Sequence, residues 1–380
     1  MDSSLPLRCP SRARSTLRCS TAPNRFPIVD MRTACAALPS QERNWDAVRA
    51  RSTGAATPLA PRLSTQSILL ARVLLRRQEL GEARRARIYR RAYGPPVPDS
   101  ELGDSHFQAV ERIPQGCLTP EIMAAVLRTS VPVVLEGAAI DCPAVQNWTP
   151  EYLAKQHGDI PVPTFREHTG TYTMTMAECM RHILQEESSE VQINNACDVL
   201  QAGEGLLDQL PLEAMARRAP SLRYHGANLF VCGAGGGSKY HCANEVNFFF
   251  QVHGEKEWNF IHPRYTSLMD PKFTLPRCSY FGSGIPWGEH PRGVPIARVV
   301  LKPGDVLVNP PWWWHWVRNR TTTIGVATRW RSWRHRFGTE NAYFSGLQWL
   351  FPHQWKIMWN DYVRGGHLND AKWVHRDGPA

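Results

Sequence analysis

Two histidines, far apart in the chain, have the surroundings that a chemical site needs. His241 follows a glycine-rich turn over residues 233–237, and His315 lies 74 positions later in the run Pro-Pro-Trp-Trp-Trp-His. Each histidine stands at the end of a strand-like segment, beside a turn. Because neutral imidazole is a common metal ligand, this pattern predicts a metal site in the mouth of a β-barrel. An ordinary core or surface role is the alternative for each histidine.

A lysine follows His241 at the start of a second strand-like segment. Residues 247–252 form an apolar run, a turn at residues 253–254 follows, and Lys256 comes next. An ordinary lysine at a strand edge is the alternative for Lys256. Ala243, two positions after His241, offers no ligand atom to a metal. Three further histidines are assigned ordinary structural roles: His253, His262 and His290.

The elements that must position these residues are mostly strands. From residue 229 the chain shows short apolar segments separated by turn residues. The predicted strands span 229–232, 246–252, 257–261, 297–301, 305–308, 315–318 and 322–328. Seven short strands separated by turns predict a β-sandwich or β-barrel, and not a parallel α/β sheet.

Helix signals flank this β region on both sides. Upstream, apolar spacing and caps predict helices over 64–93, 120–127, 149–158 and 205–220, one of about ten residues from Thr175, and a strand over 131–135. Downstream, residues 333–365 return to helical spacing. The predicted fold class is an all-β core with helical additions. The C-terminal helices either pack on the barrel or make a dimer contact.

The positive charge of the chain belongs to its N-terminal part. Residues 1–100 hold 18 arginines and no lysine against seven acidic residues, whereas the remaining 280 residues hold 26 basic and 27 acidic ones. A near-neutral body argues against a nucleic-acid groove. Residues 1–60 are rich in Arg, Ser, Ala and Pro, which is typical of an organellar transit peptide or of a disordered basic tail.

The composition predicts four parts in an intracellular protein. They are a basic segment over 1–60, a basic helix and linker over 61–98, the barrel domain over 99–332 and a helical extension over 333–380. Ten scattered cysteines include no Cys-x-x-Cys pair, which predicts a reducing compartment and no disulfide framework. No apolar run reaches the length of about 18 residues that a membrane span needs.

The order of the motifs resembles the cupin-like JmjC family of Fe(II)- and 2-oxoglutarate-dependent oxygenases, in the style of the asparaginyl hydroxylase that acts on hypoxia-inducible factor. The similar segments are His-Cys-Ala at 241–243, Asn-Phe-Phe-Phe-Gln at 247–251, Gly-Glu-Lys at 254–256 and Trp-Trp-His at 313–315. With a similar lead-in over 131–153, the resemblance covers roughly residues 106–332. It implies a double-stranded β-helix, or jelly roll.

The resemblance also implies roles for individual residues. His241 and His315 match the two histidines that hold Fe(II). Lys256 and Ser238 match the residues that bind the distal carboxylate of 2-oxoglutarate, whose buried charge needs a cationic partner. Two more residues match positions that line the pocket: Asn247 and Phe249. The substrate, a small molecule or a protein side chain, is not identified by these residues.

Ala243 departs from the family, which has Asp or Glu at this place. In one interpretation an exogenous anion fills the position, as chloride does in iron halogenases with His-x-Ala or His-x-Gly. In a second, Asn244 or Glu245 turns toward the metal. In a third, oxygenase chemistry is lost and the barrel is a cupin-fold binding protein. Arg329 and Trp330 stand near the place of a family aromatic residue, which leaves the substrate contacts open. The expected function is an oxygenase, hydroxylating or halogenase-like, with the binding protein as the alternative.

Overall fold

The computed structural model describes most of the chain from residue 59 to residue 359. The described residues are 59–77, 79–83, 93–166, 170–185, 191–196, 199–200, 203, 205–273 and 280–359, with single residues 47, 49, 50 and 87. The prediction of a transit peptide or basic tail over 1–60 therefore falls almost entirely outside the described residues.

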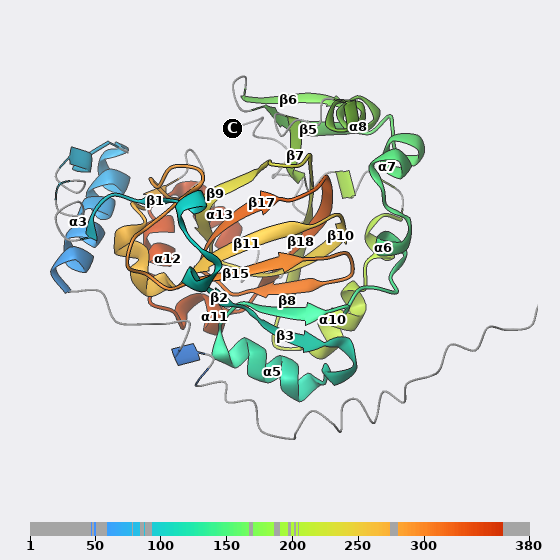
Figure 1. The fold of residues 1–380 in the computed structure, drawn as a ribbon. Helices are drawn as coiled ribbons and strands as arrows, with labels where there is room; N and C mark the ends of the chain where they lie inside the picture. The colour runs from blue at the N-terminus through green and yellow to red at the C-terminus, as the bar shows by residue number, and fades with distance from the viewer. Residues whose placement is uncertain are drawn as a thin grey trace, which may run out of the picture. The chain divides into compact units, whose positions relative to one another are not determined.

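Within these residues, the strands form two large sheets and a two-stranded ribbon (Figure 1). The nine-stranded sheet contains, in spatial order, β3 (Glu111–Pro114), β4 (Val133–Glu136), β16 (Val306–Asn309), β10 (Val246–His253), β18 (Thr323–Arg331), β8 (Arg223–Cys232), β7 (Val191–Ala196), β5 (Pro161–Arg166) and β6 (Gly170–Thr175). The seven-stranded sheet contains β12 (Lys272–Phe273), β13 (Tyr280–Gly282), β9 (Gly237–Ala243), β17 (Trp314–Asn319), β11 (Lys256–Ile261), β15 (Ile296–Leu301) and β2 (Phe107–Ala109). The ribbon pairs β1 (Val97–Pro98) with β14 (Glu289–His290).

The two large sheets face each other across an apolar interior. Phe249 on β10 and Trp258 on β11 belong to different sheets, and their ring centroids lie 4.9 Å apart. The turn between these strands needs Gly254, which has a φ of 69° and whose Cβ, if present, would lie 2.0 Å from the carbonyl oxygen of Thr322. This arrangement is a jelly roll, or double-stranded β-helix, with helical additions. The predicted fold class is confirmed.

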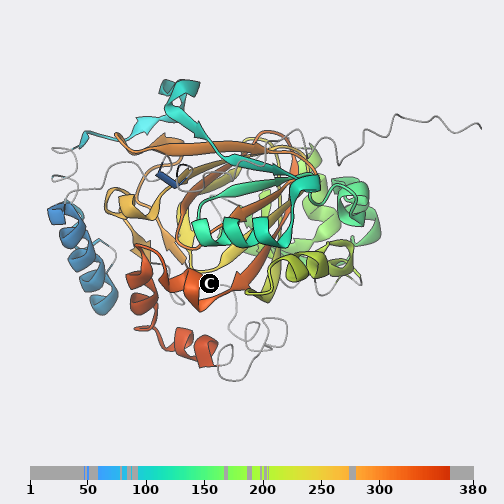
Figure 2. The same cartoon turned by 90° about the horizontal axis from the view of Figure 1, so that it is seen from below.

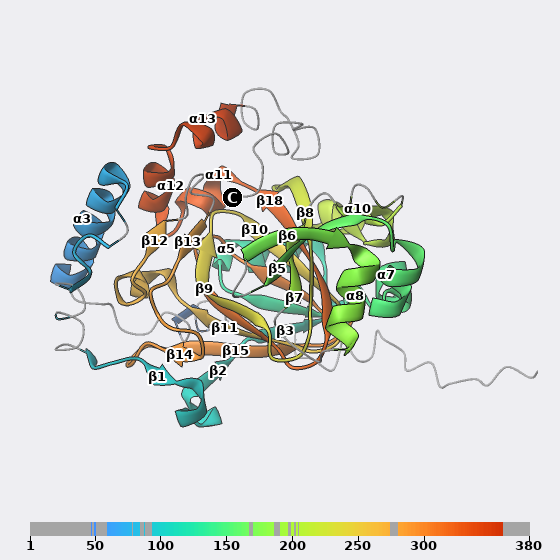
Figure 3. The same cartoon turned by 90° about the horizontal axis from the view of Figure 1, so that it is seen from above.

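Three helices begin where their capping residues predict, after Thr119, Thr149 and Thr175. The described helices are α3 (Leu59–Leu75), α5 (Pro120–Thr129), α6 (Pro143–Asn147), α7 (Pro150–Gln156), α8 (Met176–Gln185), α10 (Leu212–Arg218), α11 (Trp333–Phe337), α12 (Ala342–Gln348) and α13 (Pro352–Met358). At the start of α8, the backbone N–H of Thr175 donates to Glu178 and that of Glu178 donates to Thr175 Oγ1, which is a complete capping box. Figure 2 shows α5 lying across the strands, and Figure 3 shows α7 and α8 beside β5, β6 and β7.

The buried apolar side chains form two clusters, one on each side of the seven-stranded sheet. The first cluster fills the barrel and continues under the helices of the nine-stranded sheet; it includes Phe249, Phe250, Trp258, Phe260, Val317, Val326, Met123 and Met180. The second cluster lies on the outer face of the seven-stranded sheet; it includes Tyr240, Cys242, Trp312, Trp314, Trp316, Phe344, Leu69 and Val73. The tryptophans at 312–314 are thus core residues, with Trp313 in the first cluster and the other two in the second.

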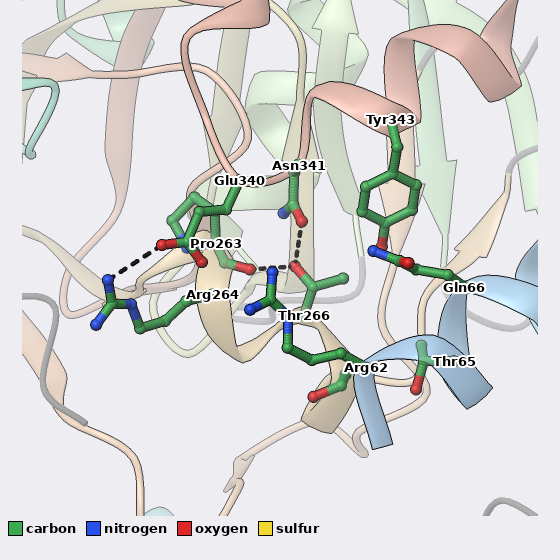
Figure 4. Close-up of a pocket in the computed structure, with 10 residues that line it drawn as sticks. Arg62, Thr65, Gln66, Pro263, Arg264, Thr266, Glu340, Asn341 and Tyr343 are labelled. Carbon is green, nitrogen blue, oxygen red and sulfur yellow. Dashed lines mark hydrogen bonds and ion pairs between the residues drawn. The ribbon is translucent and has the colours of Figure 1, made fainter. Parts of the chain in front are cut away.

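The second cluster attaches α3 and the C-terminal helices to the barrel. Leu69 and Val73 of α3 are 1% exposed, as is Phe351 before α13, and the Arg76 guanidinium lies 3.9 Å from the Phe351 ring centroid. The packing alternative for the C-terminal helices is therefore correct, while a dimer contact through them stays a prediction. A hollow between α3 and the start of α12 is lined by residues such as Thr266 and Glu340 (Figure 4). No residue of the predicted site lines it.

Three element predictions need correction. The helix predicted over 64–93 is interrupted after Leu75, because Arg76 has a left-handed φ of 53°; residues 82, 83, 87 and 93 are again helical. The helix predicted over 205–220 is a short 3-10 turn, Leu207–Gln209, followed by α10. The segment that carries His241 is not among the seven predicted strands, but it forms strand β9. The sequence of β9 lacks the apolar alternation of a strand, because it contains glycine and short polar residues. The strand is defined by its hydrogen-bonded pairing with β17 and β13.

Candidate functional site

The two histidines lie side by side on neighbouring strands. His241 on β9 and His315 on β17 are direct partners in the antiparallel pair, and their ring centroids are 4.1 Å apart. His315 is 5% exposed, and His241 is half-buried. An ion bound at a right angle to two imidazole nitrogens, each about 2.1 Å away, would put the centroids roughly 4.5 Å apart. The spacing of the rings therefore suits one shared ion.

The hydrogen bonds of the rings leave both Nε2 atoms available. Nδ1 of His241 lies 2.9 Å from the carbonyl oxygen of Lys239, and Nδ1 of His315 lies 3.0 Å from that of Trp313. Because a carbonyl only accepts, each Nδ1 carries the proton and donates it. The amide of Asn309 is 3.3 Å from Nδ1 of His315, so its oxygen must face the ring to accept that proton. Neither Nε2 has a hydrogen-bond partner among the described residues.

Burial keeps both imidazoles neutral at pH 7. Burial, helped by Arg329, lowers the pKa of His241 to about 4, although the hydrogen bond to Lys239 opposes the shift. Burial first, and then the neighbouring His241, lowers the pKa of His315 well below its ordinary value. The neutral ring is the form that can bind a metal.

A β-bulge in β9 turns Ser238 toward the same interior. His241 pairs with His315, but Ser238, three positions earlier, pairs with Val317, only two positions later. The extra residue reverses the alternation of side chains, so Ser238 faces the barrel interior with Val317. Without the bulge, it would face outward with Tyr240. In the part of the chain that the structure describes, the Ser238 hydroxyl has no hydrogen-bond partner.

Lys256 places a buried cation in the interior. It is 5% exposed, and its Nζ lies 5.1 Å from the ring centroid of Phe249. Burial lowers the pKa of Lys256 to about 8, although nearby Cys232 opposes the shift, so the ammonium group is charged at pH 7. No described carboxylate pairs with it. A bound anion would offset the free-energy cost of burying this charge.

Asn247 adds another buried polar group without a partner. It lies on the same face of β10 as Phe249, is 3% exposed, and pairs in register with Asn309 on β16 and with Arg329 on β18. Its Oδ1 is buried and makes no hydrogen bond with the described residues. Unpaired buried polar groups are uncommon in folded proteins, so Asn247 suits a polar ligand.

The residues after His241 are held by other partners. The carbonyl of Ala243 accepts from the backbone N–H of Trp312 at 2.7 Å, so β9 is fixed at this point. Nδ2 of Asn244 donates to Oε1 of Gln348 on α12 at 3.1 Å. The Asn244 side chain is therefore used for attaching α12, and it supplies no ligand beside the histidines in this structure.

Glu245 is also committed elsewhere. Its Oε1 lies 2.7 Å from Nδ1 of His225 and 3.1 Å from Nε of Arg331. Burial alone would raise the pKa of Glu245, but His225, Arg331 and Arg329 outweigh it and hold the pKa below its usual range. Burial lowers the pKa of His225 to about 4, so at pH 7 the two arginines are the charges that keep Glu245 ionised. The structure gives no support to an inward turn of Asn244 or Glu245.

Arg329 is the site residue whose role the sequence did not predict. It pairs in register with Asn247 and with Gly226 on β8, so it faces the barrel interior at the level of the histidines. The predicted strand ended at residue 328, one position too early to include it. The signal is the alternation Gly325, Ala327, Arg329 along β18, which places two small residues and then one cation on the inner face.

The described residues contain no group of three His, Cys, Asp or Glu side chains that could hold a metal ion. The structure does bring all six sequence-predicted residues to one interior: His241, His315, Lys256, Ser238, Asn247 and Phe249. Two nitrogen donors and three polar groups without hydrogen-bond partners among the described residues thus face the same interior. This arrangement can bind an anionic organic ligand, and it can hold a metal only if non-protein ligands complete the coordination.

A jelly-roll barrel with paired histidines inside its mouth defines the class of this protein. Its sequence matches the family of the cupin-like domain over residues 119–337, more than half of the chain. The chain belongs to this family. It is similar to "JmjC domain-containing protein A" of Dictyostelium discoideum, with 25% identity over 240 residues, which cover 57% of this chain and 94% of that relative. The predicted cupin-like JmjC domain is confirmed. None of the described helices is both long and apolar enough to span a membrane.

Proposed function

We propose that this protein is an Fe(II)- and 2-oxoglutarate-dependent oxygenase. The observation that carries the proposal is a set of three interior groups without partners among the described residues: the Lys256 ammonium, the Ser238 hydroxyl and the Asn247 amide. Such groups are costly in an apolar barrel unless a ligand pairs with them. The cupin-like family and the JmjC-domain relative favour 2-oxoglutarate as that ligand.

The chain's own residues would bind and orient the cosubstrate. Lys256 would pair with the distal carboxylate in a charge-assisted contact, and Ser238, turned inward by the bulge, would donate to the same group. Phe249 and Trp258, whose centroids are 4.9 Å apart, would exclude water from its apolar middle. A low local dielectric would strengthen the contact with Lys256.

His241 and His315 would hold Fe(II) through Nε2, with the rings fixed by their hydrogen bonds to backbone carbonyls. Bound Fe(II) would supply the redox chemistry that couples oxidation of 2-oxoglutarate to oxidation of a substrate. The two imidazoles fit two ligand positions, and Ala243 contributes none. A bound anion, such as a halide, would complete the set, and a nearby Arg329 would favour that anion. Halogenation is then the variant of the activity to test beside hydroxylation.

A cupin-fold binding protein is the second candidate, and one observation favours it. Ala243 removes a negative charge from beside the histidines, and Arg329 adds a positive one. Both changes weaken the binding of a divalent cation, whereas Lys256 and Ser238 serve anion binding equally well without a metal. In this alternative the barrel binds an organic acid and catalyses no oxidation.

Calorimetric titration of 2-oxoglutarate tests the shared part of both candidates. We expect Lys256→Met to bind 2-oxoglutarate about tenfold to a hundredfold more weakly than the parent, because a hydrogen bond to a charged group is worth about 1.5–3 kcal/mol. Lys155→Met, on the exposed face of α7, is the matched control and should bind as the parent does. Equal affinity in the parent and in Lys256→Met would place Lys256 outside the site.

Iron analysis then separates the two candidates. Anaerobically purified protein is titrated with Fe(II) in the presence of 2-oxoglutarate, with and without chloride. Binding of Fe(II) supports the oxygenase. Binding of 2-oxoglutarate without any binding of Fe(II) supports the binding protein.

A further inference from the structure

Arg329 is a half-buried cation that makes no direct contact with an acidic side chain among the described residues. Its register with Asn247 on β10 and Gly226 on β8 turns it into the mouth of the barrel. Gly226 has no side chain to cover it on one flank. In the part of the chain that the structure describes, the guanidinium makes no hydrogen bond and no ion pair. Five N–H donors are therefore available at the level of the two histidines.

Glu245, the acidic residue that acts electrostatically on Arg329, makes no hydrogen bond or ion pair with it among the described contacts. Glu245 acts on Arg329 electrostatically, but its Oε1 contacts His225 at 2.7 Å and Arg331 at 3.1 Å instead. The matched arginine on the same strand, Arg331, therefore has a carboxylate partner, whereas Arg329 has none. Because Glu245 acts on Arg329 only through space, the guanidinium N–H groups of Arg329 stay available to an anion from outside the chain.

We propose that Arg329 binds a carboxylate or phosphate group of the substrate at the mouth of the barrel, beside His241 and His315. A planar guanidinium forms two parallel hydrogen bonds with such an oxyanion. A neutral substrate would leave the guanidinium without an anionic hydrogen-bond acceptor. Asn247, whose amide has no partner among the described residues, stands directly opposite Arg329 and adds a polar contact. The substrate class is thus a small anionic molecule or an acidic side chain.

This inference rests on the proposed function, because the mouth is where a substrate would meet the histidines. The anion contact itself needs no metal, so it can be measured on metal-stripped protein. Lys256 and Arg329 lie at different depths in the barrel. Lys256 pairs with Asn319 and lies four positions along β11 from Phe260, which is the partner of His315. Variants of Lys256 and Arg329 can therefore be told apart.

The experiment records the thermal unfolding midpoint against the concentration of acetate or of inorganic phosphate, at constant ionic strength and without metal. The rise of the midpoint gives an apparent affinity for each probe. We expect Arg329→Gln to weaken the binding of at least one probe by about tenfold to a hundredfold. Arg320→Gln, on the outer face where Arg320 contacts Glu257, corrects for general salt effects and should behave as the parent. The stronger probe tells carboxylate from phosphate.

The outcomes separate this inference from the proposed function. Identical dependence on both probes in the parent and in Arg329→Gln overturns the inference. Loss of the effect in Lys256→Met alone also overturns it, since the anion then binds at the deeper cation. An effect that depends on Arg329, in protein that binds neither Fe(II) nor 2-oxoglutarate, supports the inference and rejects the oxygenase. If Arg329→Gln does not fold, Arg329→Lys keeps the charge without the planar fork and should still weaken binding.

Discussion

The charge on Lys256 sets how cosubstrate binding should depend on pH. With a pKa of about 8 in the empty barrel, the ammonium group is charged at pH 7, and a bound anion would raise that pKa. The affinity for 2-oxoglutarate should therefore be full below about pH 8. It should fall as the pH rises, by up to about tenfold per pH unit, until the pKa of the complex is passed. Titrations between pH 6.5 and 9.5 measure this.

The control for this pH dependence is Lys256→Met, which should show no such fall. The lowered pKa of Lys256 has the opposite effect on the stability of the empty protein, which should increase as the pH rises. Burial of the charge costs on the order of 3 kcal/mol below pH 8, and this cost is relieved as the pH rises toward the ordinary pKa of lysine. An affinity of the parent that stays flat to pH 9.5 would contradict a role for Lys256.

Ala243 is the position at which the proposed metal site lacks a protein carboxylate. Ala243→Asp adds a carboxylate two positions from His241 and should strengthen Fe(II) binding, because a third protein ligand then replaces an exogenous one. Binding should also become independent of chloride. Ala243→Asn has nearly the same shape without the charge and serves as the control. Anaerobic Fe(II) titration with and without chloride is the measurement, and an equal effect of both variants would argue against a carboxylate ligand at this position.

Motif order located six residues of the candidate site, and two others needed the structure. The spacing around His241, Lys256 and His315 was informative, because each residue follows a recognisable turn. Arg329 has only the signal of the alternation along β18, and Asn309 has no local signal. The direction of both side chains into the barrel depends on the pairing register of neighbouring strands, which cannot be read from the sequence. Asn309 also precedes two prolines, which favour a turn at this place.

At the level of secondary structure, the bulge in β9 changes which side chains face the barrel interior, so simple alternation along the sequence gives the wrong direction for Ser238. Ser238 and His241 are three positions apart, and a regular strand puts such residues on opposite faces. The inserted residue lets both face the interior. Seven predicted strands were found because their apolar runs are long and buried, whereas β9 mixes glycine, serine and lysine. Only its two neighbours in the sheet define it.

The attachment of α3 gives a stability prediction. Arg72 is 1% exposed, and its Nη1 lies 2.9 Å from Oδ1 of Asp270. Arg72→Met should lower the free energy of unfolding by about 3–5 kcal/mol, because removal of one partner leaves a buried charge behind. Arg77→Met, an exposed position just after α3, is the control. Chemical denaturation measures both, and an equal, small effect would mean that α3 contributes little to the fold.

This attachment also bears on the domain boundary. Composition placed the start of the folded body after the linker at 94–98, yet Leu69 and Val73 of α3 are buried with the barrel's outer cluster. We propose that the stable core begins near residue 59. Limited proteolysis followed by mass spectrometry tests this, and a stable product that starts at residue 95–105 would favour the boundary given by composition.

Across the whole protein, residues 101–380 are nearly neutral in net charge, but the barrel interior contains two cationic side chains. Residues 101–380 hold 26 basic and 27 acidic residues, but Lys256 and Arg329 face the barrel without a described anionic partner. A barrel of this kind should bind anions, and it should bind a divalent metal well only when an anion is already present. Metal and cosubstrate binding are therefore expected to be coupled.

Anaerobic calorimetry of Fe(II), with and without saturating 2-oxoglutarate, tests the proposed oxygenase. We expect weak binding of Fe(II) alone and tighter binding with 2-oxoglutarate. Fe(II) should raise the affinity for 2-oxoglutarate by the same factor, as thermodynamic linkage requires, and His315→Ala should abolish the coupling. No binding of Fe(II) to the parent under either condition, with 2-oxoglutarate still bound, would contradict the oxygenase and leave a cupin-fold binding protein.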